Sequence, residues 1–209
     1  MTVPVTTRSP WALEYARRPD EYVLGTAPSA FARMLRSLLA PGARVLELGC
    51  GEGRDSVFFA RCGCDVTAVD VSAAGLRKGD RLARLAGVEV RWVHDDAARY
   101  LPGGTFDFVY SCGAIHYVPR RLRAGLLARV KASTSPIGIH AHLVFTDRTV
   151  YVEKNERIDY FSAGELGRVY ADWQIWWNGH GTIACDRDGR PHLHGVEELI
   201  ARRTPASGG

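Results

Sequence analysis

The sequence predicts an α/β fold with a doubly wound, mostly parallel sheet of seven strands and an antiparallel C-terminal hairpin. Strand-like and helix-like segments alternate from about residue 30 to residue 145, which is typical of a parallel sheet covered by helices on both faces. Two strand-like segments then follow each other with only a turn between them. In addition, a glycine-rich turn comes directly after the first buried strand, and such turns bind ligands in open α/β sheets.

Hydrophobic spacing predicts each element in turn. Apolar residues recur at helical spacing over 30–39, and Pro41 and Gly42 end that helix before the first strand. Strands are expected at 44–48, 64–70, 88–93, 106–110 and 138–145, and helices at about 53–62, 72–86 and 120–132. The hairpin should pair 171–184 with 192–201 through a turn at 186–191. The 209 residues are expected to form a single domain over 1–203, followed by a disordered tail at 204–209.

Composition excludes few classes of function. The formal net charge is only +4, and the densest basic cluster, Arg120, Arg121 and Arg123, is expected to be a solvated helix face. Nucleic-acid binding is therefore not expected, while an anionic substrate stays open. The sequence lacks an N-terminal apolar run and a membrane-span pattern, and its five cysteines lack paired spacing, so a cytoplasmic protein with reduced thiols is expected.

The central motif runs from Val45 to Gly53, an apolar strand followed by Gly49, Gly51 and Gly53 with Cys50 between them. Dinucleotide enzymes bind a pyrophosphate with a related loop that has a third glycine three residues after the second. Arg54 stands at that position here. Glu47, at the end of the strand, would repel a pyrophosphate and suits a cationic amino group. The charge pattern therefore favours S-adenosylmethionine, which has an ammonium and a sulfonium and no phosphate, over a generic nucleotide.

Two further acids follow at the expected ends of the next strands. Asp70 lies 21 residues after Gly49, where an acid can accept hydrogen bonds from ribose hydroxyls. Asp96 and Ala97 follow the third strand and could contact the adenine amino group, although an acid pair there is also a common helix cap.

These segments resemble the class I S-adenosylmethionine-dependent methyltransferases, which have a Rossmann-like fold, over about residues 25–145. Glu47–Gly53 resembles the glycine-rich motif of that family, Asp70 its ribose acid, Asp96 and Ala97 its adenine contact, and 106–111 its fourth strand. The resemblance implies that the cofactor contacts are Glu47, Gly49, Cys50, Gly51, Gly53, Asp70, Val71, Asp96, Ala97 and Ser111.

Segments 22–31 and 53–56 are more narrowly similar to the tellurite-resistance and thiopurine methyltransferase-like branch. In that branch the N-terminal segment, here residues 1–30, folds over the cofactor, which would place Tyr22 near the site. The sequence departs from the pattern of the branch after Trp177, which leaves the substrate open.

The candidate catalytic residues are His116, Tyr117 and Tyr22. His116 and Tyr117 lie in the loop after the fourth strand, which should face the transferred methyl group. His116 could act as a general base near neutral pH, and the alternative is that it only shapes the pocket. A strong base is optional when the acceptor is already a thiolate or an amine.

Three further features lie outside the motif. His192 and His194 could share a strand face and bind a metal with Glu197 or Glu198, but a solvated strand end is the favoured interpretation and no metal is expected. His140 and His142 have the same spacing. Trp173, Trp176 and Trp177 are expected to pack against the sheet, with a substrate pocket as the alternative.

The sequence therefore predicts an S-adenosylmethionine-dependent methyltransferase that acts on S, N or O of a small molecule and releases S-adenosylhomocysteine, in a role such as biosynthesis. One alternative is an enzyme that uses the same pocket for a non-methylating step such as cyclisation. Another is a non-catalytic partner subunit with the same fold. A homo-oligomer or a partner subunit is compatible with the sequence, and a membrane is not expected as a partner.

Overall fold

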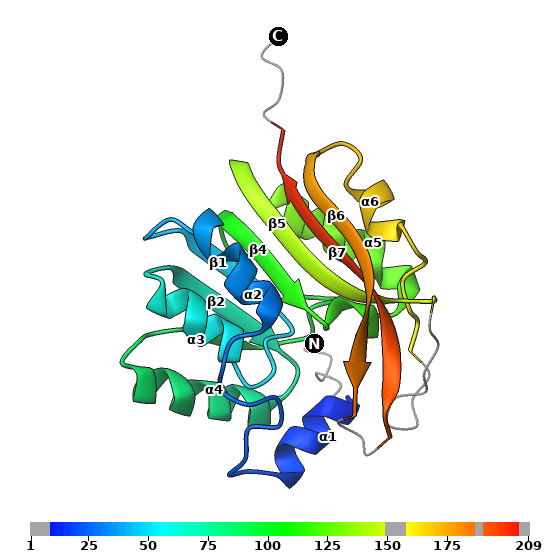
Figure 1. Ribbon diagram of the computed structural model, residues 1–209. Coiled ribbons are helices and arrows are strands. Elements are labelled where there is room, and N and C mark those ends of the chain that lie inside the picture. The colour runs from blue at the N-terminus through cyan, green and yellow to red at the C-terminus, as the bar shows by residue number, and fades with distance from the viewer. Residues whose placement is uncertain (1–8, 149–157, 187–189, 205–209) are drawn as a thin grey trace, which may run out of the picture.

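A computed structural model describes residues 9–148, 158–186 and 190–204 of the protein. Its seven strands form one sheet in the order β3-β2-β1-β4-β5-β7-β6 (Figure 1). The strands are β1 (Arg44–Leu48), β2 (Asp65–Asp70), β3 (Arg91–His94), β4 (Phe106–Cys112), β5 (Thr134–Thr146), β6 (Gln174–Cys185) and β7 (His192–Arg202). β1 to β5 are parallel, and β7 runs antiparallel between β5 and β6. The predicted fold class, including the antiparallel hairpin, is confirmed.

Helices cover both faces of this sheet. They are α1 (Pro10–Arg17), α2 (Ala30–Met34), α3 (Arg54–Arg61), α4 (Ala73–Ala86), α5 (Arg120–Ala132) and α6 (Glu165–Val169), with short 3₁₀ turns η1 (Leu35–Leu38) and η2 (Ile115–Tyr117). α2, α3 and α4 lie on one face, and α5 and α6 lie on the other (Figure 1). Two apolar cores result, one around Phe59 and Phe108 and the other around Leu126 and Val109. In the described part of the chain, no helix combines the length and the apolar content that crossing a membrane requires.

The structure differs from the sequence-based expectations at several elements. α1 and α6 were not predicted, and β5 begins four residues earlier than expected, with a register shift against β4 near Pro136, which has no N–H for the ladder. The predicted tail at 204–209 lies outside the described residues except for its first residue. Trp173 is buried as predicted, but Trp176 and Trp177 are about half exposed on the edge strand β6. Trp176 makes a cross-strand contact, because the Arg202 guanidinium of β7 lies 5.8 Å from the centre of its ring.

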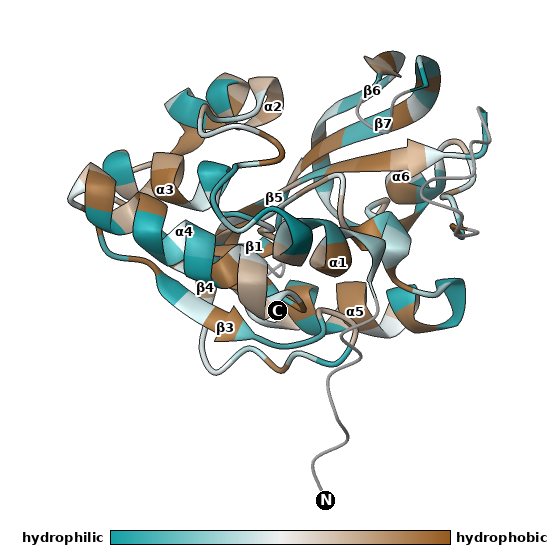
Figure 2. Ribbon diagram, turned by 90° about the horizontal axis from the view of Figure 1, so that it is seen from below, coloured by the Kyte–Doolittle hydropathy of each residue, from teal (hydrophilic) through white to brown (hydrophobic). Residues whose placement is uncertain are grey.

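α1 and the segment after it lie across the carboxyl edge of the sheet, as the view in Figure 2 shows from below. This is the edge where the glycine-rich turn leaves β1 and where ligands bind in open α/β sheets. The N-terminal segment therefore covers the region in which the sequence predicts the site.

A chain of buried hydrogen bonds crosses the interior between α5 and β4. The Thr134 hydroxyl donates to the Val130 carbonyl at 2.6 Å, so it accepts the Nε2 proton of His140 at 2.7 Å. His140 Nδ1 must then accept the Tyr170 hydroxyl proton at 2.6 Å. Tyr170 in turn accepts the Nε2 proton of His142 at 2.9 Å, and His142 Nδ1 accepts the hydroxyl proton of Ser111 at 2.9 Å.

His140 and His142, the two histidines in this series of hydrogen bonds, are neutral. Burial lowers the pKa of His140 well below its usual value and lowers the pKa of His142 to about 3. His140 and His142 lie on the same face of β5, as expected, and both side chains are buried.

Candidate active site

The glycine-rich turn between β1 and α3 forms the floor of the candidate site. Gly49, Gly51 and Gly53 have φ values of +73°, +56° and +79°, a region that side chains with a Cβ rarely adopt. A Cβ at Gly51 would also lie 2.7 Å from the Tyr15 hydroxyl of α1. The alternating glycines are therefore required by the turn itself and by the close approach of α1, and Cys50 between them is buried.

Buried carboxylates line this turn on the α3 side. Glu47 is 4% exposed at the end of β1 and accepts a short hydrogen bond from the Ser56 hydroxyl of α3. Burial, and then the charge of nearby Asp55, raise the pKa of Glu47 well above its usual value. Asp55 accepts hydrogen bonds from the Tyr110 hydroxyl at 2.8 Å and from the Ser29 backbone N–H at 2.7 Å. The two acids make this end of the turn favourable for a cation.

Asp70 closes the other side of the turn from the end of β2. Its Oδ2 accepts the Gly51 backbone N–H at 2.8 Å, and its Oδ1 accepts the Ser72 N–H at 2.8 Å. Burial raises the pKa of Asp70 in spite of these two bonds. The carbonyl of the next residue, Val71, accepts a hydrogen bond from His94 Nε2 at 2.9 Å, which joins β2 to β3 beside the site.

A buried ion pair, which no sequence pattern indicates, fastens the N-terminal segment to the turn. Lys78 of α4 is 4% exposed and donates to Glu52 Oε1 at 2.7 Å and to the Glu21 carbonyl at 2.7 Å. Glu52 Oε2 accepts the Leu24 N–H at 3.3 Å. We call Glu52, Lys78, Glu21 and Leu24 the latch, because these four residues hold residues 21–24 against the turn.

Tyr15, not Tyr22, is the N-terminal tyrosine that meets the glycine-rich turn. Tyr15 is buried against Gly51, and burial together with the charge of Asp70 raises its pKa well above the usual value. The Tyr22 hydroxyl instead donates to the Lys78 carbonyl at 3.0 Å, and its ring lies under the Arg81 guanidinium. Trp11 and Tyr15 are four residues apart after Pro10, a spacing that could have indicated the helix.

The loop after β4 contains the other two candidate catalytic residues. His116 is fully buried and stacks on Phe145 with ring centroids 4.3 Å apart. Its Nδ1 accepts the Phe145 N–H at 3.3 Å, which assigns the ring proton to Nε2. Burial and the charge of Arg123 lower the pKa of His116 well below its usual value. The Tyr117 hydroxyl accepts a hydrogen bond from Trp11 Nε1 at 2.7 Å, which joins this loop to α1.

Arg123 corrects one sequence-based expectation. It was expected on a solvated face with Arg120 and Arg121, but it is 2% exposed. Its guanidinium donates to the Val118 and His116 carbonyls, both at 2.9 Å, and lies over the Phe161 ring. The hydrogen bonds hold the loop after β4 in place, and Arg120 and Arg121 stay exposed.

The remaining predicted contacts lie at the ends of β3 and β4. Asp96 Oδ1 accepts the Ala98 N–H at 2.9 Å and thereby caps a turn rather than a helix, and Ala97 is partly buried against the core. The Ser111 side chain is engaged by His142 in the interior. Roles for these residues toward a cofactor stay predictions.

Comparisons with known proteins agree with the fold and with the position of the motif. The methyltransferase domain family matches residues 45–138. An uncharacterized protein of Mycobacterium tuberculosis is 36% identical over 158 residues, which cover 69% of this chain and 56% of that protein. The chain therefore spans little more than half the length of this curated relative.

Two solved structures show the same fold. TehB from Haemophilus influenzae superposes with a TM-score of 0.77 at 20% identity, over 87% of this chain and 64% of that chain. The 1,6-didemethyltoxoflavin-N1-methyltransferase of Burkholderia thailandensis, with bound 1,6-didemethyltoxoflavin and S-adenosylhomocysteine, superposes with a TM-score of 0.68 at 23% identity, over 98% and 92%.

Proposed function

We propose that this chain, which carries a methyltransferase domain of the class I fold, transfers a methyl group from S-adenosylmethionine to a small molecule. The observation that carries the proposal is the glycine-rich turn bordered by the buried acids Glu47 and Glu52 and the partly buried acid Asp70. S-adenosylhomocysteine would be the second product. The acceptor atom is S, N or O.

The residues at the turn fit this cofactor better than a dinucleotide. Burial beside Asp55 raises the pKa of Glu47, so an ammonium group bound there would favour the ionised carboxylate and pair with it, whereas a pyrophosphate would add a like charge. Asp70 would take the ribose, because its carboxylate accepts the backbone N–H groups of Gly51 and Ser72 and has further lone pairs for hydroxyl donors. Cys50, Val71, Asp96, Ala97 and Ser111 complete the proposed contacts.

When bound, the cofactor supplies an electrophilic methyl group on a sulfonium. The chain itself needs to align the acceptor and exclude water, since an in-line displacement depends mainly on positioning. The hydrogen bond from Trp11 to Tyr117 and the contact of Tyr15 with Gly51 close α1 over the carboxyl edge. Arg123 holds the loop that would carry the acceptor.

In this proposal His116 does not act as a general base. Its Nδ1 is occupied by the Phe145 N–H, and its Nε2 carries the proton, so neither nitrogen offers a lone pair in this arrangement. We propose that His116 shapes the acceptor pocket and that the acceptor supplies its own nucleophile. Tyr117 and Tyr22 then position α1 and α4.

The relatives support a small acceptor. The Burkholderia thailandensis enzyme binds 1,6-didemethyltoxoflavin, and this chain superposes on 92% of its length. We extend the class of acceptor, a small molecule, to this chain, and experiment has to identify the acceptor atom.

Two measurements test the proposal. Calorimetry should show micromolar binding of S-adenosylmethionine and S-adenosylhomocysteine and no binding of NAD; NAD binding without S-adenosylmethionine binding would refute it. A release screen for S-adenosylhomocysteine over thiols, amines, phenols and carboxylates should find turnover. Product without matching S-adenosylhomocysteine would favour a non-methylating step, and cofactor binding without turnover would favour a partner subunit.

A further inference from the structure

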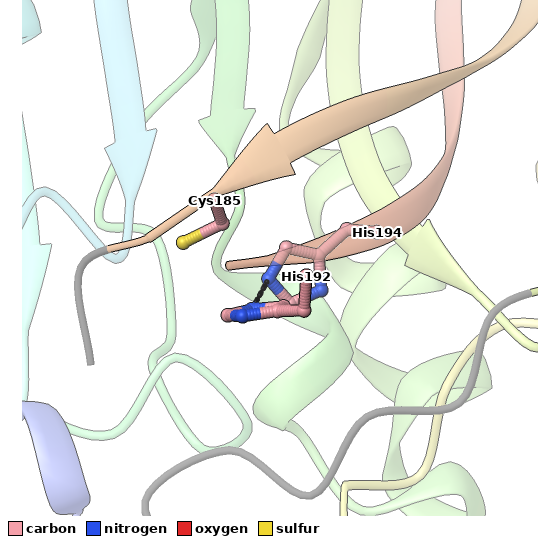
Figure 3. A group of neighbouring side chains, drawn as sticks. All are labelled: Cys185, His192 and His194. Atoms are coloured by element: carbon pink, nitrogen blue, oxygen red, sulfur yellow. Dashed lines mark hydrogen bonds between the residues drawn. The ribbon is translucent and has the colours of Figure 1, made fainter. Parts of the chain in front are cut away.

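Three side chains of types that bind metals meet at the end of the C-terminal hairpin, and none of them belongs to the glycine-rich turn. Cys185 is the last residue of β6 and pairs across the ladder with His192, the first residue of β7. His194 lies two residues farther along β7, so its side chain projects from the same face as His192. Figure 3 shows the three side chains pointing toward one another.

The distances are close to those of a tetrahedral metal site. One ligand atom from each residue, the Cys185 sulfur and one nitrogen of each histidine, lies within 4.8 Å of the other two. His192 Nε2 and His194 Nε2 are 2.8 Å apart. Around tetrahedral zinc, bond lengths of about 2.0–2.1 Å to nitrogen and 2.3 Å to sulfur require nitrogen atoms about 3.3 Å apart and sulfur about 3.6 Å from nitrogen. Adjustments of about 1 Å would bring the three ligands to that geometry.

The surroundings of His192 are those of a metal ligand. Its Nδ1 donates to the Arg190 carbonyl at 2.7 Å, which leaves the Nε2 lone pair directed at the cluster. Metal-binding histidines commonly donate their other ring N–H to a carbonyl in this way, because the bond selects the tautomer and orients the ring. In the metal-free cluster this lone pair accepts the Nε2 proton of His194.

His194 is held in place before any ion arrives. It is 2% exposed and stacks on Phe145 with ring centroids 4.0 Å apart and planes inclined by 15°. Phe145 stacks in turn on His116, so the cluster lies beside the loop after β4 at the carboxyl edge. A ligand that is already packed loses little side-chain freedom on binding.

We propose that Cys185, His192 and His194 bind one divalent ion of the zinc class. A thiolate and two imidazoles select zinc and related transition metals over magnesium and calcium, which prefer oxygen ligands. On binding, the Cys185 thiol releases its proton to solvent, and His194 moves its proton from Nε2 to Nδ1 so that Nε2 can ligate. Three protein ligands leave a coordination position for water or another ligand. The sequence favoured a solvated strand end and no metal, so this proposal takes up the alternative for His192 and His194 with Cys185 in place of the glutamates. The Glu197 carboxylate instead accepts the N–H groups of Gly164 and Gly167.

Titration of the metal-free full chain with Co²⁺ under reducing conditions tests the proposal without any activity assay. We expect one equivalent to bind with a sulfur-to-cobalt charge-transfer band, and Zn²⁺ to displace it. Cys185→Ser should abolish the band and weaken Zn²⁺ binding by at least about tenfold, and His192→Gln should weaken it similarly. Circular dichroism would verify that each variant is folded.

Matched controls come from the same protein. Cys62→Ser removes a partly buried thiol elsewhere, and His180→Gln removes an exposed histidine of β6; both should leave the band and the affinity unchanged. Failure of the wild-type chain to bind one equivalent of either ion would overturn the proposal. So would a charge-transfer band that persists in Cys185→Ser. Because no cofactor is needed, this outcome is independent of the methyl-transfer proposal.

Discussion

The latch gives the sharpest test of how the N-terminal segment is held. Lys78→Met keeps the length and the apolar stem of the side chain but removes the charge that contacts Glu52. The Glu52 side chain is 2% exposed and would keep only the Leu24 N–H at 3.3 Å. Removing one partner of a buried ion pair destabilises a protein by about 3–5 kcal/mol. We expect a loss of that size in the free energy of unfolding, measured in urea.

Two further variants show whether the loss comes from the unpaired carboxylate. The double variant Lys78→Met, Glu52→Gln removes both charges and should recover at least about half of the loss, because no buried charge is left without its partner. Arg84→Met breaks the exposed pair with Asp80 on the same helix and should change stability by about 0.5 kcal/mol or less. If Lys78→Met is no more destabilising than Arg84→Met, the latch does not stabilise the fold and the reasoning is wrong.

The remaining predictions concern the cofactor acid, the loop after β4 and the interior chain. Asp70→Ala should weaken S-adenosylhomocysteine binding by about 1.5–3 kcal/mol in calorimetry, because charge-assisted bonds to the ribose are lost; an unchanged Kd would place the ribose elsewhere. His116→Gln should raise KM with little change in kcat, whereas a loss of about a hundredfold in kcat together with the acid limb of the pH profile would identify it as the base. Tyr170→Phe leaves His140 Nδ1 without a donor and His142 Nε2–H without an acceptor, so unfolding in urea should show a loss of about 2–5 kcal/mol; a loss below about 1 kcal/mol would contradict the assigned chain. Because the folded-state pKa of His142 is depressed to about 3, its contribution to stability is present above about pH 6.5 and should be lost as the pH falls toward 3; urea midpoints that stay level from pH 7 to pH 5 would refute this.

The central strands and the site's glycines could be predicted from sequence because their signals are local. A buried strand such as β1 has an apolar run, and its turn has glycines at alternate positions. The alternation of strands and helices then predicts that Glu47, Asp70 and Asp96, which lie at or just beyond the ends of successive strands, come to the same edge of the sheet.

The features that were missed depend on contacts between distant segments. Glu52 and Lys78 are 26 residues apart, and neither has a sequence pattern that distinguishes it from a surface charge. The sequence pattern places Arg123 on a basic surface, but its guanidinium is buried because it donates hydrogen bonds to the carbonyls of His116 and Val118. Cys185 and His192 meet only through the register of the β6–β7 ladder, which spacing along the chain does not reveal.

The buried series of hydrogen bonds that begins at the Val130 carbonyl runs in one direction. The Val130 carbonyl can only accept a hydrogen bond. Each side chain that follows, as far as Ser111 on β4, therefore donates its proton toward Val130, and each one before Ser111 accepts a proton from the next residue in the series. The Ser111 hydroxyl proton is committed to His142, so its oxygen has lone pairs to offer but no hydrogen. The Ser111 side chain is fully buried, so these lone pairs face the interior of the protein. A carbonyl on helix α5 thus sets, through five side chains, the direction of each hydrogen bond as far as the end of β4.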